Sequence, residues 1–427
     1  MNEQNILVIG GGGREHALVW KIAQSPLVDR IYCAPGNGGT ASTAENVDIN
    51  VEDIKELIRF AKDNRIDLTV VGPEGPLTLG IVDSFSEAGL KIFGPSKEAA
   101  ILEGSKAFMK ELLTRAGAPT ARYEIHDDHY KAEQALERFD ERVVIKADGL
   151  AAGKGVIICH NRDEARHAIN HLMLDRYFGH AGDKVIIEET LEGEEASILA
   201  FCDGEELIMM PSSQDHKRIG DGDTGPNTGG MGAYSPAPVI TPDIEKWIEE
   251  NVMRKVLKTM ADDGRAYKGI LYAGIMITKN GPYVLEFNCR FGDPECQPIL
   301  MRMDSDIVPI LHACVDGNLR GATLDWSADS AVCVVMSAKG YPGSYENGLA
   351  IRGIGKANER DNVYVFHAGT RIDERGKVIT SGGRVLGVTA RAPKIGDAIE
   401  TAYSAIGEIY WHHAYYRKDI GKKALNR

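Results

Sequence analysis

The sequence lacks the features that mark membrane, secreted and zinc-binding proteins. No stretch of its 427 residues approaches the ~18 to 20 consecutive apolar residues that a membrane-spanning helix needs. Met1–Gln4 leads directly into the apolar run Asn5–Gly10, which leaves no room for the charged and apolar regions of a signal peptide. The seven cysteines are an odd number and form no CxxC pair, so neither a zinc knuckle nor a disulfide framework is indicated. We therefore expect a soluble, cytoplasmic protein with free thiols.

Positive charge is also in short supply. Lys and Arg number 49 against 62 Asp and Glu, and the net charge of −13 argues against nonspecific binding to nucleic acid or to anionic membranes. Anionic substrates would need local sites made from a few cations and oriented backbone N–H groups. Hydrophobic content of 43% and charged content of 26% are ordinary for a globular protein. The length suggests about three domains of roughly 150 residues each.

The first hundred residues alternate strand and helix signals. The expected strands are Ile6–Ile9, Arg30–Ala34, Leu68–Val71 and Lys91–Phe93, and the expected helices are Glu15–Gln24, Val51–Asn64 and a stretch near Gly80–Ala88. This alternation predicts βαβ units and a parallel sheet covered on both faces. A Gly/Pro loop follows each strand, and ligands of such sheets bind where these loops gather.

The first of these loops, Gly10–Gly13, invites comparison with dinucleotide-binding loops. The match fails because Glu15 replaces the third glycine and the second strand ends in Ala34–Gly36 rather than in an acid. Two interpretations stay open. The loop holds a phosphate or carboxylate on backbone N–H groups at the helix N-terminus, or its glycines simply permit a tight turn.

A second region opens at Ser105, a predicted N-cap for a helix that ends at Gly117. From about Thr120 to Glu195 we expect a compact βαβ-like piece, small enough to be a separate lid. Its predicted elements are strand Val143–Ala147, loop Asp148–Gly155, strand Val156–Cys159, helix Arg162–Leu174 and strand Lys184–Glu188.

Lys146 lies within an apolar strand, where a buried ammonium is costly unless it meets an anion. The small residues of the loop Asp148–Gly155, with Lys154 among them, suit a flap that closes on phosphates. It is not a P-loop, because no helix and no Ser or Thr follows Lys154. The alternative is a surface hairpin with a snorkelling lysine.

Two further segments carry chemistry. In the run 188–195, a strand end can offer backbone groups to an adenine edge and a later carboxylate can accept ribose hydroxyls, although acidic loops are mostly solvated surface. In Leu285–Arg290, period-2 alternation places Glu286, Asn288 and Arg290 on one face and Leu285, Phe287 and Cys289 on the other. The two oxygen ligands suit Mg²⁺, and the arginine beside them can bind phosphoryl oxygens. The alternative is that this segment is an antiparallel edge strand with one polar face.

Residues 211–238 are rich in Gly, Pro, Asn, Ser and Asp, which predicts a long loop, and its aromatic and cationic content favours a functional role. Beyond Asp325 we expect strands Ala331–Ser337 and Arg384–Ala390 and a closing helix, Ile395–Ile409. No internal repeat is visible.

Taken together, these motifs resemble the phosphoribosylamine–glycine ligase (glycinamide ribonucleotide synthetase) family of the ATP-grasp superfamily, over essentially the whole chain. The matching runs are Val8–Ala17, Ala34–Thr40, Val71–Pro76, Glu103–Phe108, Val144–Val156, Ser213–Pro238, Glu286–Glu295, Phe366–Thr370, Gly382–Leu386 and Arg417–Gly421. Many ordered matches of this kind are not expected by accident.

The resemblance implies an α/β fold in three parts. They are a pre-ATP-grasp parallel-sheet domain (1–103), an ATP-grasp core (104–326) with a mobile lid subdomain (about 121–192), and a smaller C-terminal α+β domain (327–427). It also implies ATP-dependent ligation of glycine to 5-phosphoribosylamine through glycyl phosphate, in de novo purine biosynthesis, with Mg²⁺ or Mn²⁺. A monomer or weak homodimer without nucleic-acid or membrane partners is expected.

The resemblance further assigns roles to individual residues. The expected catalytic residues are Arg290, Lys146 and Lys106. The expected ATP-binding residues are Lys106, Lys146, Gly153, Lys154, Gly155, Glu188, Glu189, Leu191 and Glu195. The expected substrate-binding residues are Gly11, Gly12, Gly13, Arg14, Gly36, Asn37, Asp215, Lys217, Arg218, Asp293 and Glu295. The expected metal ligands are Glu286 and Asn288, and the acid that many ATP-grasp enzymes carry on the preceding strand is missing from Gly269–Thr278.

Two other functions compete with this one. A related ATP-grasp carboxylase or ligase would use the same core with a different acid and amine. A non-catalytic nucleotide sensor would keep the fold without turnover, although the intact Glu286, Asn288 and Arg290 disfavour it.

Overall fold

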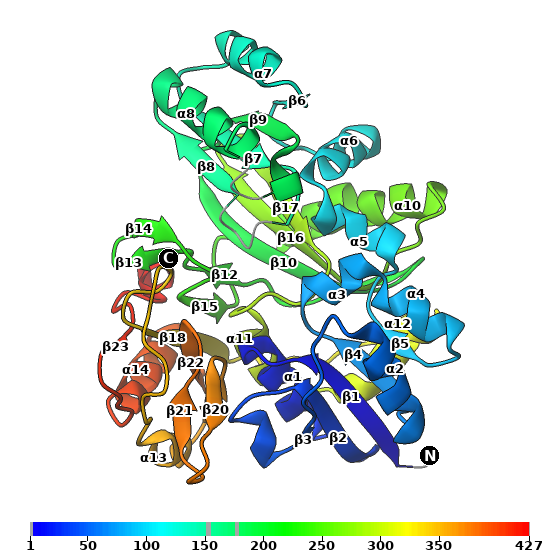
Figure 1. The fold of residues 1–427 in the computed structure, drawn as a ribbon, viewed down its shortest axis with the longest axis vertical. Coiled ribbons are helices and arrows are strands. Elements are labelled where there is room, and N and C mark those ends of the chain that lie inside the picture. The colour runs from blue at the N-terminus through cyan, green and yellow to red at the C-terminus, as the bar shows by residue number, and fades with distance from the viewer. Residues whose placement is uncertain (1–2, 151–154, 176–178, 427) are drawn as a thin grey trace.

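A computed structural model describes residues 3–150, 155–175 and 179–426 of the protein (Figure 1). The N-terminal region is a five-stranded parallel sheet in the order β3-β2-β1-β4-β5. Its strands are β1 (Gln4–Gly10), β2 (Val28–Pro35), β3 (Glu45–Asn46), β4 (Leu68–Val71) and β5 (Ile92–Phe93). Every residue of β4 is buried, as expected for a strand covered on both faces. The predicted parallel sheet is confirmed.

Five helices accompany this sheet. They are α1 (Gly13–Ile22), α2 (Ile54–Asp63), α3 (Glu74–Leu79), α4 (Ile81–Glu87) and α5 (Lys97–Gly104). The helix expected near Gly80–Ala88 is present as α4. The preceding α3 was not predicted, and Gly80, in a left-handed conformation (φ 92°), separates the two helices.

The central region is built on a four-stranded antiparallel sheet in the order β11-β10-β16-β17. Its strands are β10 (Glu194–Asp203), β11 (Leu207–Met209), β16 (Lys268–Thr278) and β17 (Gly281–Asn288), and the helices around it are α6 (Lys106–Ala116), α9 (Pro242–Ile248), α10 (Arg254–Asp262), α11 (Cys296–Met301) and α12 (Ile307–Asp316). Ser105 caps α6 as predicted, since its hydroxyl accepts a hydrogen bond from Phe108 N at 3.1 Å.

The lid is a separate small sheet at the top of Figure 1 with its own apolar core. It comprises β6 (Tyr123–His126), β7 (Val143–Ala147), β8 (Val156–Cys159) and β9 (Val185–Glu189), with helices α7 (His129–Ala135) and α8 (Arg162–Met173). The strand order is β6-β9-β7-β8 and every pair is antiparallel. The expected βαβ-like topology is therefore wrong, because β7 and β8 form a hairpin and β9 returns antiparallel to β7.

The expectation of a long loop over residues 211–238 is also wrong. The segment contains β12 (Gln214–Asp215), β13 (Arg218–Gly220), β14 (Thr224–Asn227) and β15 (Gly232–Ser235). Strands of two to four residues are too short to show period-2 alternation, and glycine and proline mask them further. Both β12 and β15 join the sheet of the C-terminal region, so the chain crosses between regions here.

The C-terminal region lies beside the N-terminal sheet (Figure 1). Its sheet runs β12-β15-β18-β22-β19, with β23 paired to β18. The elements are β18 (Ser330–Ala338), β19 (Val363–His367), β20 (Thr370–Ile372), β21 (Val378–Thr380), β22 (Arg384–Ala392), β23 (Ala414–Tyr415), α13 (Ile354–Asn358) and α14 (Ile395–Ile406). The two strands and the helix expected here are present, and the helix ends three residues early, before Gly407.

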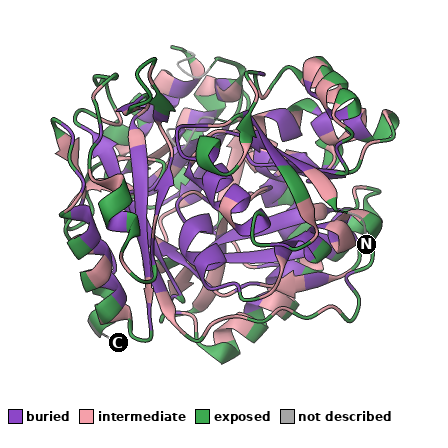
Figure 2. Ribbon diagram, turned by 90° about the horizontal axis from the view of Figure 1, so that it is seen from below, coloured by how far each residue is buried: buried purple, intermediate pink, exposed green. Residues whose placement is uncertain are grey.

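The buried residues form the interiors of these regions. Sheets and inward helix faces are buried, and the rim of the molecule is exposed (Figure 2). All seven cysteines are buried free thiols, which agrees with the expectation of no disulfide framework. Within the described part of the chain, no helix has the length and apolar character of a membrane span.

Candidate active site

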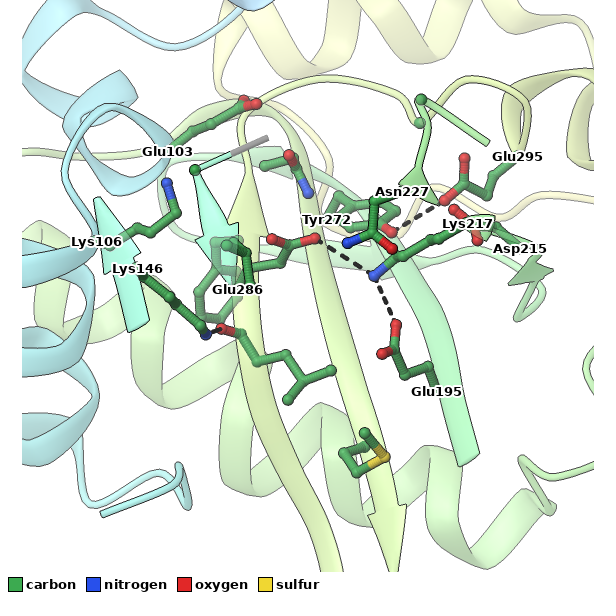
Figure 3. Close-up of a pocket in the computed structure, with 18 of the residues that line it drawn as sticks. Glu103, Lys106, Lys146, Glu195, Asp215, Lys217, Asn227, Tyr272, Glu286 and Glu295 are labelled. Atoms are coloured by element: carbon green, nitrogen blue, oxygen red, sulfur yellow. Dashed lines mark hydrogen bonds and ion pairs between the residues drawn. The ribbon is translucent and has the colours of Figure 1, made fainter. Parts of the chain in front are cut away.

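A cavity of about 720 Å³ lies between the lid, the central sheet and the C-terminal region. Figure 3 shows lysines from the lid side on one flank of Glu286 and a group of acids with Lys217 on the other. The predicted site residues that line the cavity are Arg14, Lys106, Lys146, Gly155, Glu188, Glu189, Leu191, Glu195, Asp215, Lys217, Arg218, Glu286, Asn288, Arg290, Asp293 and Glu295. Segments almost 300 residues apart in the chain thus meet at one surface.

Lys146 has the anionic partner that its buried position demands. Its ammonium nitrogen lies 2.9 Å from Glu188 Oε1 and donates to Leu285 O at 3.2 Å. The other oxygen of Glu188 lies 2.9 Å from Lys110 Nζ, and Lys110 is fully buried. Burial lowers the pKa of Lys110 to about 8, against the opposing attraction of Glu188. Lys110 was missed from the sequence because it occurs in an ordinary amphipathic helix and pairs with a residue far along the chain.

Lys106 joins the lid to the central region at the start of α6. Its Nζ donates to Gly149 O at 3.2 Å, and its backbone N–H donates to Asp148 O at 3.0 Å. The carboxylate of Asp148 accepts from Ser105 Oγ at 2.9 Å and from Ala107 N at 2.7 Å. An acid from the lid therefore completes the N-terminus of a helix in the core. Burial lowers the pKa of Lys106.

Strand β17 carries Glu286 and Asn288 into the cavity, but its alternation is interrupted. The pairing with β16 shifts between Gly274 and Ile275, which leaves Leu285 as an extra residue. Val284 and Phe287 pack in the core, whereas Leu285 lines the cavity beside Glu286. The expected placement of Leu285 on the packed face is therefore wrong, and the physical reason is this β-bulge.

Lys217 connects two acids across the cavity. Its Nζ lies 2.6 Å from Glu195 Oε2 on β10 and 3.8 Å from Glu286 Oε1 on β17 (Figure 3). Burial opposes the charge of Lys217, but the two carboxylates raise its pKa well above the usual value. Burial alone would raise the pKa of Glu286, yet Lys217 and Lys146 hold it below the ordinary range. Both groups stay charged at neutral pH.

A second acidic group lies beyond Lys217. Glu295 Oε1 accepts hydrogen bonds from Tyr272 Oη at 3.0 Å and from Ser197 Oγ at 3.2 Å. Asp215 lies nearby on β12, and burial together with the charge of Glu295 raises its pKa well above the usual value. This end of the cavity can receive a cation or a proton.

Arg290 lies just past the end of β17 and is held by two carboxylates. Its Nε donates to Glu74 Oε2 at 3.1 Å and its NH2 donates to Glu103 Oε1 at 2.8 Å. The remaining oxygen of Glu103 accepts from Cys289 N at 2.7 Å, so the acid fixes both the backbone and the guanidinium. Glu74 and Glu103 were not assigned as site residues, because their importance depends on contacts more than 180 positions away.

The N-terminal glycine loop is occupied by the protein's own carboxylates. Glu15 accepts from Gly12 N at 2.6 Å, and Asp293 accepts from Arg14 N at 3.4 Å. Arg14 itself pairs with Glu15 at 2.6 Å and donates to Phe291 O at 2.9 Å. Of the residues described, the cavity lining does not include Gly11, Gly12, Gly13, Gly36 or Asn37.

Asn37 has a connecting role in this loop. Its amide nitrogen donates to Gly11 O at 3.0 Å and to His367 O at 2.9 Å, while its oxygen accepts from Gly39 N at 2.8 Å. His367 N donates to His16 Nδ1 at 2.7 Å, so the N-terminal and C-terminal regions are joined through two buried histidines.

Two predicted site residues lie outside the part of the chain that the structure describes, and Arg384, which lines the cavity, was not predicted. Gly153 and Lys154 belong to the segment 151–154, outside the described residues. Arg384 lines the cavity from the C-terminal region, donating to Asp293 O at 2.6 Å and lying 3.4 Å from the Asp293 carboxylate. Its motif was noticed in the sequence, but no role was given to it.

An antiparallel core sheet with a separate small sheet above it, and lysines facing acids between them, defines an ATP-grasp enzyme. The chain matches three parts of one family, described as the N domain (residues 4–103), the ATP-grasp (A) domain (residues 104–296) and the C domain (residues 331–423) of phosphoribosylglycinamide synthetase. It belongs to the phosphoribosylamine–glycine ligase family.

Relatives named phosphoribosylamine–glycine ligase are similar over their whole length. The Rhodopirellula baltica protein is 51% identical, with 100% of this chain and 99% of the relative covered. The Escherichia coli K12 protein is 51% identical, with 99% of both covered. The crystal structure of the Thermotoga maritima ligase has a TM-score of 0.85 at 32% identity, covering 97% of this chain and 100% of that one.

The ATP-grasp fold is shared with more distant enzymes. A biotin carboxylase from Campylobacter jejuni, solved as a β-γ-ATP complex, has a TM-score of 0.77 at 15% identity, covering 99% of this chain and 95% of that one. At that identity the likeness concerns the fold alone.

Proposed function

We propose that this enzyme ligates glycine to 5-phosphoribosylamine with consumption of ATP, giving glycinamide ribonucleotide, ADP and phosphate in purine biosynthesis. The observation that carries the proposal is the division of one cavity into a lysine-rich flank below the lid and an acid-rich flank beside the C-terminal region. The first suits the phosphates of ATP, and the second suits an amine.

ATP would lie between the lid and the central sheet. Glu188 and Glu189 end strand β9, where backbone groups can meet an adenine edge, and Leu191 and Glu195 follow in the cavity wall. Lys106 and Lys146 would face the phosphates. Because Glu188 already has Lys110 as a second partner, Lys146 can turn toward a phosphate without leaving Glu188 buried and uncompensated.

In the first step a glycine carboxylate oxygen attacks the γ-phosphorus of ATP, and the bond from that phosphorus to the ADP oxygen breaks. Two anions must approach each other, so fixed positive charge is the main requirement. Lys106, Lys146 and Arg290 supply it from three different elements. Arg290 is held in place by Glu74 and Glu103 before any substrate arrives, which limits the reorganisation needed during reaction.

Glu286 and Asn288 fit a divalent cation such as Mg²⁺ or Mn²⁺. Both are oxygen donors on one strand and both line the cavity. The lowered pKa of Glu286 keeps it ionised. Among the described residues no cluster of three or more His, Cys, Asp or Glu forms a closed metal cage, which suits an ion that keeps phosphate oxygens and water as ligands. When bound, such an ion would neutralise phosphate charge.

In the second step the amine nitrogen of phosphoribosylamine attacks the acyl carbon of glycyl phosphate. The carbon–oxygen bond to phosphate breaks, and the nitrogen loses a proton. Asp215 and Glu295 lie at the acid-rich flank, where a carboxylate can accept this proton. Lys217, Arg218 and Asp293 would orient the acceptor substrate from the same flank. The N-terminal loop with Gly11, Gly12, Gly13, Gly36 and Asn37 would support Arg14 and Asp293 from behind.

The test is ADP release measured with glycine and phosphoribosylamine, each omitted in turn, with glycinamide ribonucleotide identified by mass. Turnover should require both substrates and should fall when alanine or bicarbonate replaces glycine. ADP release that ignores glycine, or that proceeds with bicarbonate, would overturn the proposal in favour of a different ATP-grasp reaction. The Arg360→Met variant, which changes an arginine outside the cavity lining, is the control for activity lost during preparation.

A further inference from the structure

The hairpin β13–β14 (residues 217–228, hereafter the cavity hairpin) supplies one wall of the cavity. Lys217, Arg218, Asn227 and Thr228 all line it. Figure 3 places Lys217 and Asn227 across Glu286 from Lys106 and Lys146, on the flank proposed above for the acceptor substrate. The position of this hairpin therefore decides where the charge of Lys217 lies.

The cavity hairpin has little structure of its own. Strands β13 and β14 pair with each other, and within the described residues no third strand joins them. The register shifts between Arg218 and Gly220, and glycines 222 and 225 adopt positive φ angles. An isolated two-stranded ribbon is marginally stable in water, so its position depends on what it packs against.

The last residues of the chain supply that support. The segment 415–423, hereafter the C-terminal tail, lies against the hairpin, and the red C-terminal part of the ribbon is drawn near β13 and β14 in Figure 1. Six hydrogen bonds join the two segments: Tyr415 Oη to Ile219 O (3.0 Å), Arg417 NH1 to Arg218 O (3.0 Å) and to Asp223 Oδ1 (2.9 Å), Lys418 N to Asp221 Oδ1 (2.8 Å), Gly222 N to Asp419 Oδ2 (2.8 Å), and Lys423 Nζ to Asp223 Oδ2 (2.6 Å).

Arg417 is the centre of this contact. Its side chain is 0% exposed, and it forms a two-point pair with Asp419 within the tail, at 2.8 and 2.7 Å. It reaches across to Asp223 and to the carbonyl of Arg218, the residue next to Lys217. A guanidinium can hold this arrangement because its donors lie in a fixed plane, and a lysine cannot reproduce it.

The tail is in turn fixed to the C-terminal region. Tyr403 Oη on α14 donates to Arg417 O at 2.7 Å and accepts from Ile420 N at 3.1 Å. Tyr415 pairs with Ser337 of β18, and Ile420 is buried in the C-terminal apolar core. The hairpin is therefore held by the C-terminal region and makes its cavity contact from there.

We propose that Arg417 is a positioning residue, which acts through the C-terminal tail and the cavity hairpin chiefly on the affinity for the acceptor substrate. The inference rests on the proposed function for the identity of glycine and phosphoribosylamine. The physical placement of the hairpin does not depend on that identity.

The decisive variant is Arg417→Met, compared with Arg360→Met, which removes an arginine paired with Glu408 elsewhere in the C-terminal region. KM for phosphoribosylamine should rise roughly tenfold or more in Arg417→Met, with a smaller change in KM for ATP. Hydrogen exchange of peptides covering 217–228 should accelerate, with exchange in 54–63 unchanged. Arg360→Met should alter neither readout.

Equal changes in all three KM values, or unchanged exchange in 217–228, would overturn the proposal. If Arg417→Met does not fold, Tyr415→Phe replaces it, because that change removes one hydroxyl donor and no charge. The KM values and the hydrogen exchange of 217–228 are then compared in that variant in the same way. Failure of wild-type turnover with glycine would instead count against the proposed function, and the exchange experiment, which needs no substrate, would still test the positioning role.

Discussion

Lys217 Nζ lies 2.6 Å from Glu195 Oε2 and 3.8 Å from Glu286 Oε1, so its stronger partner is the acid that is not a proposed metal ligand. Glu286 is therefore only loosely engaged by the lysine. It can turn toward a divalent cation while Lys217 keeps a compensating carboxylate. Metal binding and acceptor binding are thus adjacent but separable.

This arrangement predicts how Glu286→Gln behaves. Gln keeps an oxygen donor but loses the charge that favours a hard cation, so activity should require roughly tenfold more Mg²⁺ or above. The melting temperature without metal should change little, because Glu286 is 35% exposed in its side chain and Lys217 retains Glu195. Activity against Mg²⁺ concentration and apo-protein melting are the two measurements.

Glu195→Gln is the matched control for that substitution. It removes the closer partner of Lys217 but no proposed metal ligand, so the Mg²⁺ requirement should rise less than in Glu286→Gln. A Glu286→Gln protein with an unmoved Mg²⁺ curve and a lowered melting temperature would assign Glu286 to structure.

Lys110 and Lys146 share Glu188, and we expect substitution of the first to affect stability and substitution of the second to affect turnover. Lys110→Met removes one of the two cationic partners of a buried carboxylate and should lower the free energy of unfolding by ~1–3 kcal/mol. Lys146→Met should lower turnover by ~10²–10³ because a phosphate contact is lost. Urea unfolding and ADP release check the pair. A Lys110→Met protein of normal stability would show that Glu188 is compensated by Lys146 alone.

Arg290→Ala should damage both stability and turnover. The substitution removes the cation shared by Glu74 and Glu103, and Glu103 is buried. Turnover should fall by ~10²–10³, and unfolding should become easier by ~3–5 kcal/mol. Arg290→Lys, which keeps the charge without the two-pronged geometry, should recover part of the stability but little turnover. Near-normal ADP release in Arg290→Ala would remove Arg290 from the reaction.

The histidines between the N-terminal and C-terminal regions predict a pH dependence of stability. Burial lowers the pKa of His16 to about 3 and that of His367 to about 4, against 6.5 in an unfolded chain. Below pH 6.5 these histidines bind protons in the unfolded state but stay neutral in the folded state. The free energy of unfolding therefore falls as the pH falls. Between pH 6.5 and 5 each imidazole should contribute a loss of ~2 kcal/mol.

The check is unfolding at several pH values in wild type and in His16→Asn. Asn can keep an acceptor for His367 N but does not titrate, so the variant should be less stable overall and should show a shallower dependence on pH. An identical pH slope in the two proteins would mean that His16 is not the titrating group.

The sequence was most informative where structure is local. The parallel sheet followed from apolar runs separated by helices, and Ser105 was recognisable as an N-cap from its neighbours alone. The expectation of Leu285 on the packed face failed because a bulge depends on the partner strand. The expected loop at 211–238 failed because its strands are too short to show a pattern, and because β15 is defined by pairing with β18, about a hundred positions away.

The candidate site followed the same rule. Motifs on single segments located Lys146, Glu286 and Arg290, all of which line the cavity. Glu74 and Glu103 lie in runs that resemble the family but were given no role, and nothing local distinguishes Lys110. The roles of all three became visible only through their ion pairs. The domain boundaries after residues 103 and 326 stay predictions, and limited proteolysis would test them.

The seven buried thiols have a practical consequence. A thiol-modifying reagent can reach them only when the structure around them opens. The rate at which each cysteine is modified therefore reports the local opening of its own region. Cys159 lies in the lid core, Cys33 in the N-terminal sheet and Cys333 in the C-terminal sheet. The modification rates of the native cysteines can therefore rank the regions of the enzyme by how often they open, without any introduced label.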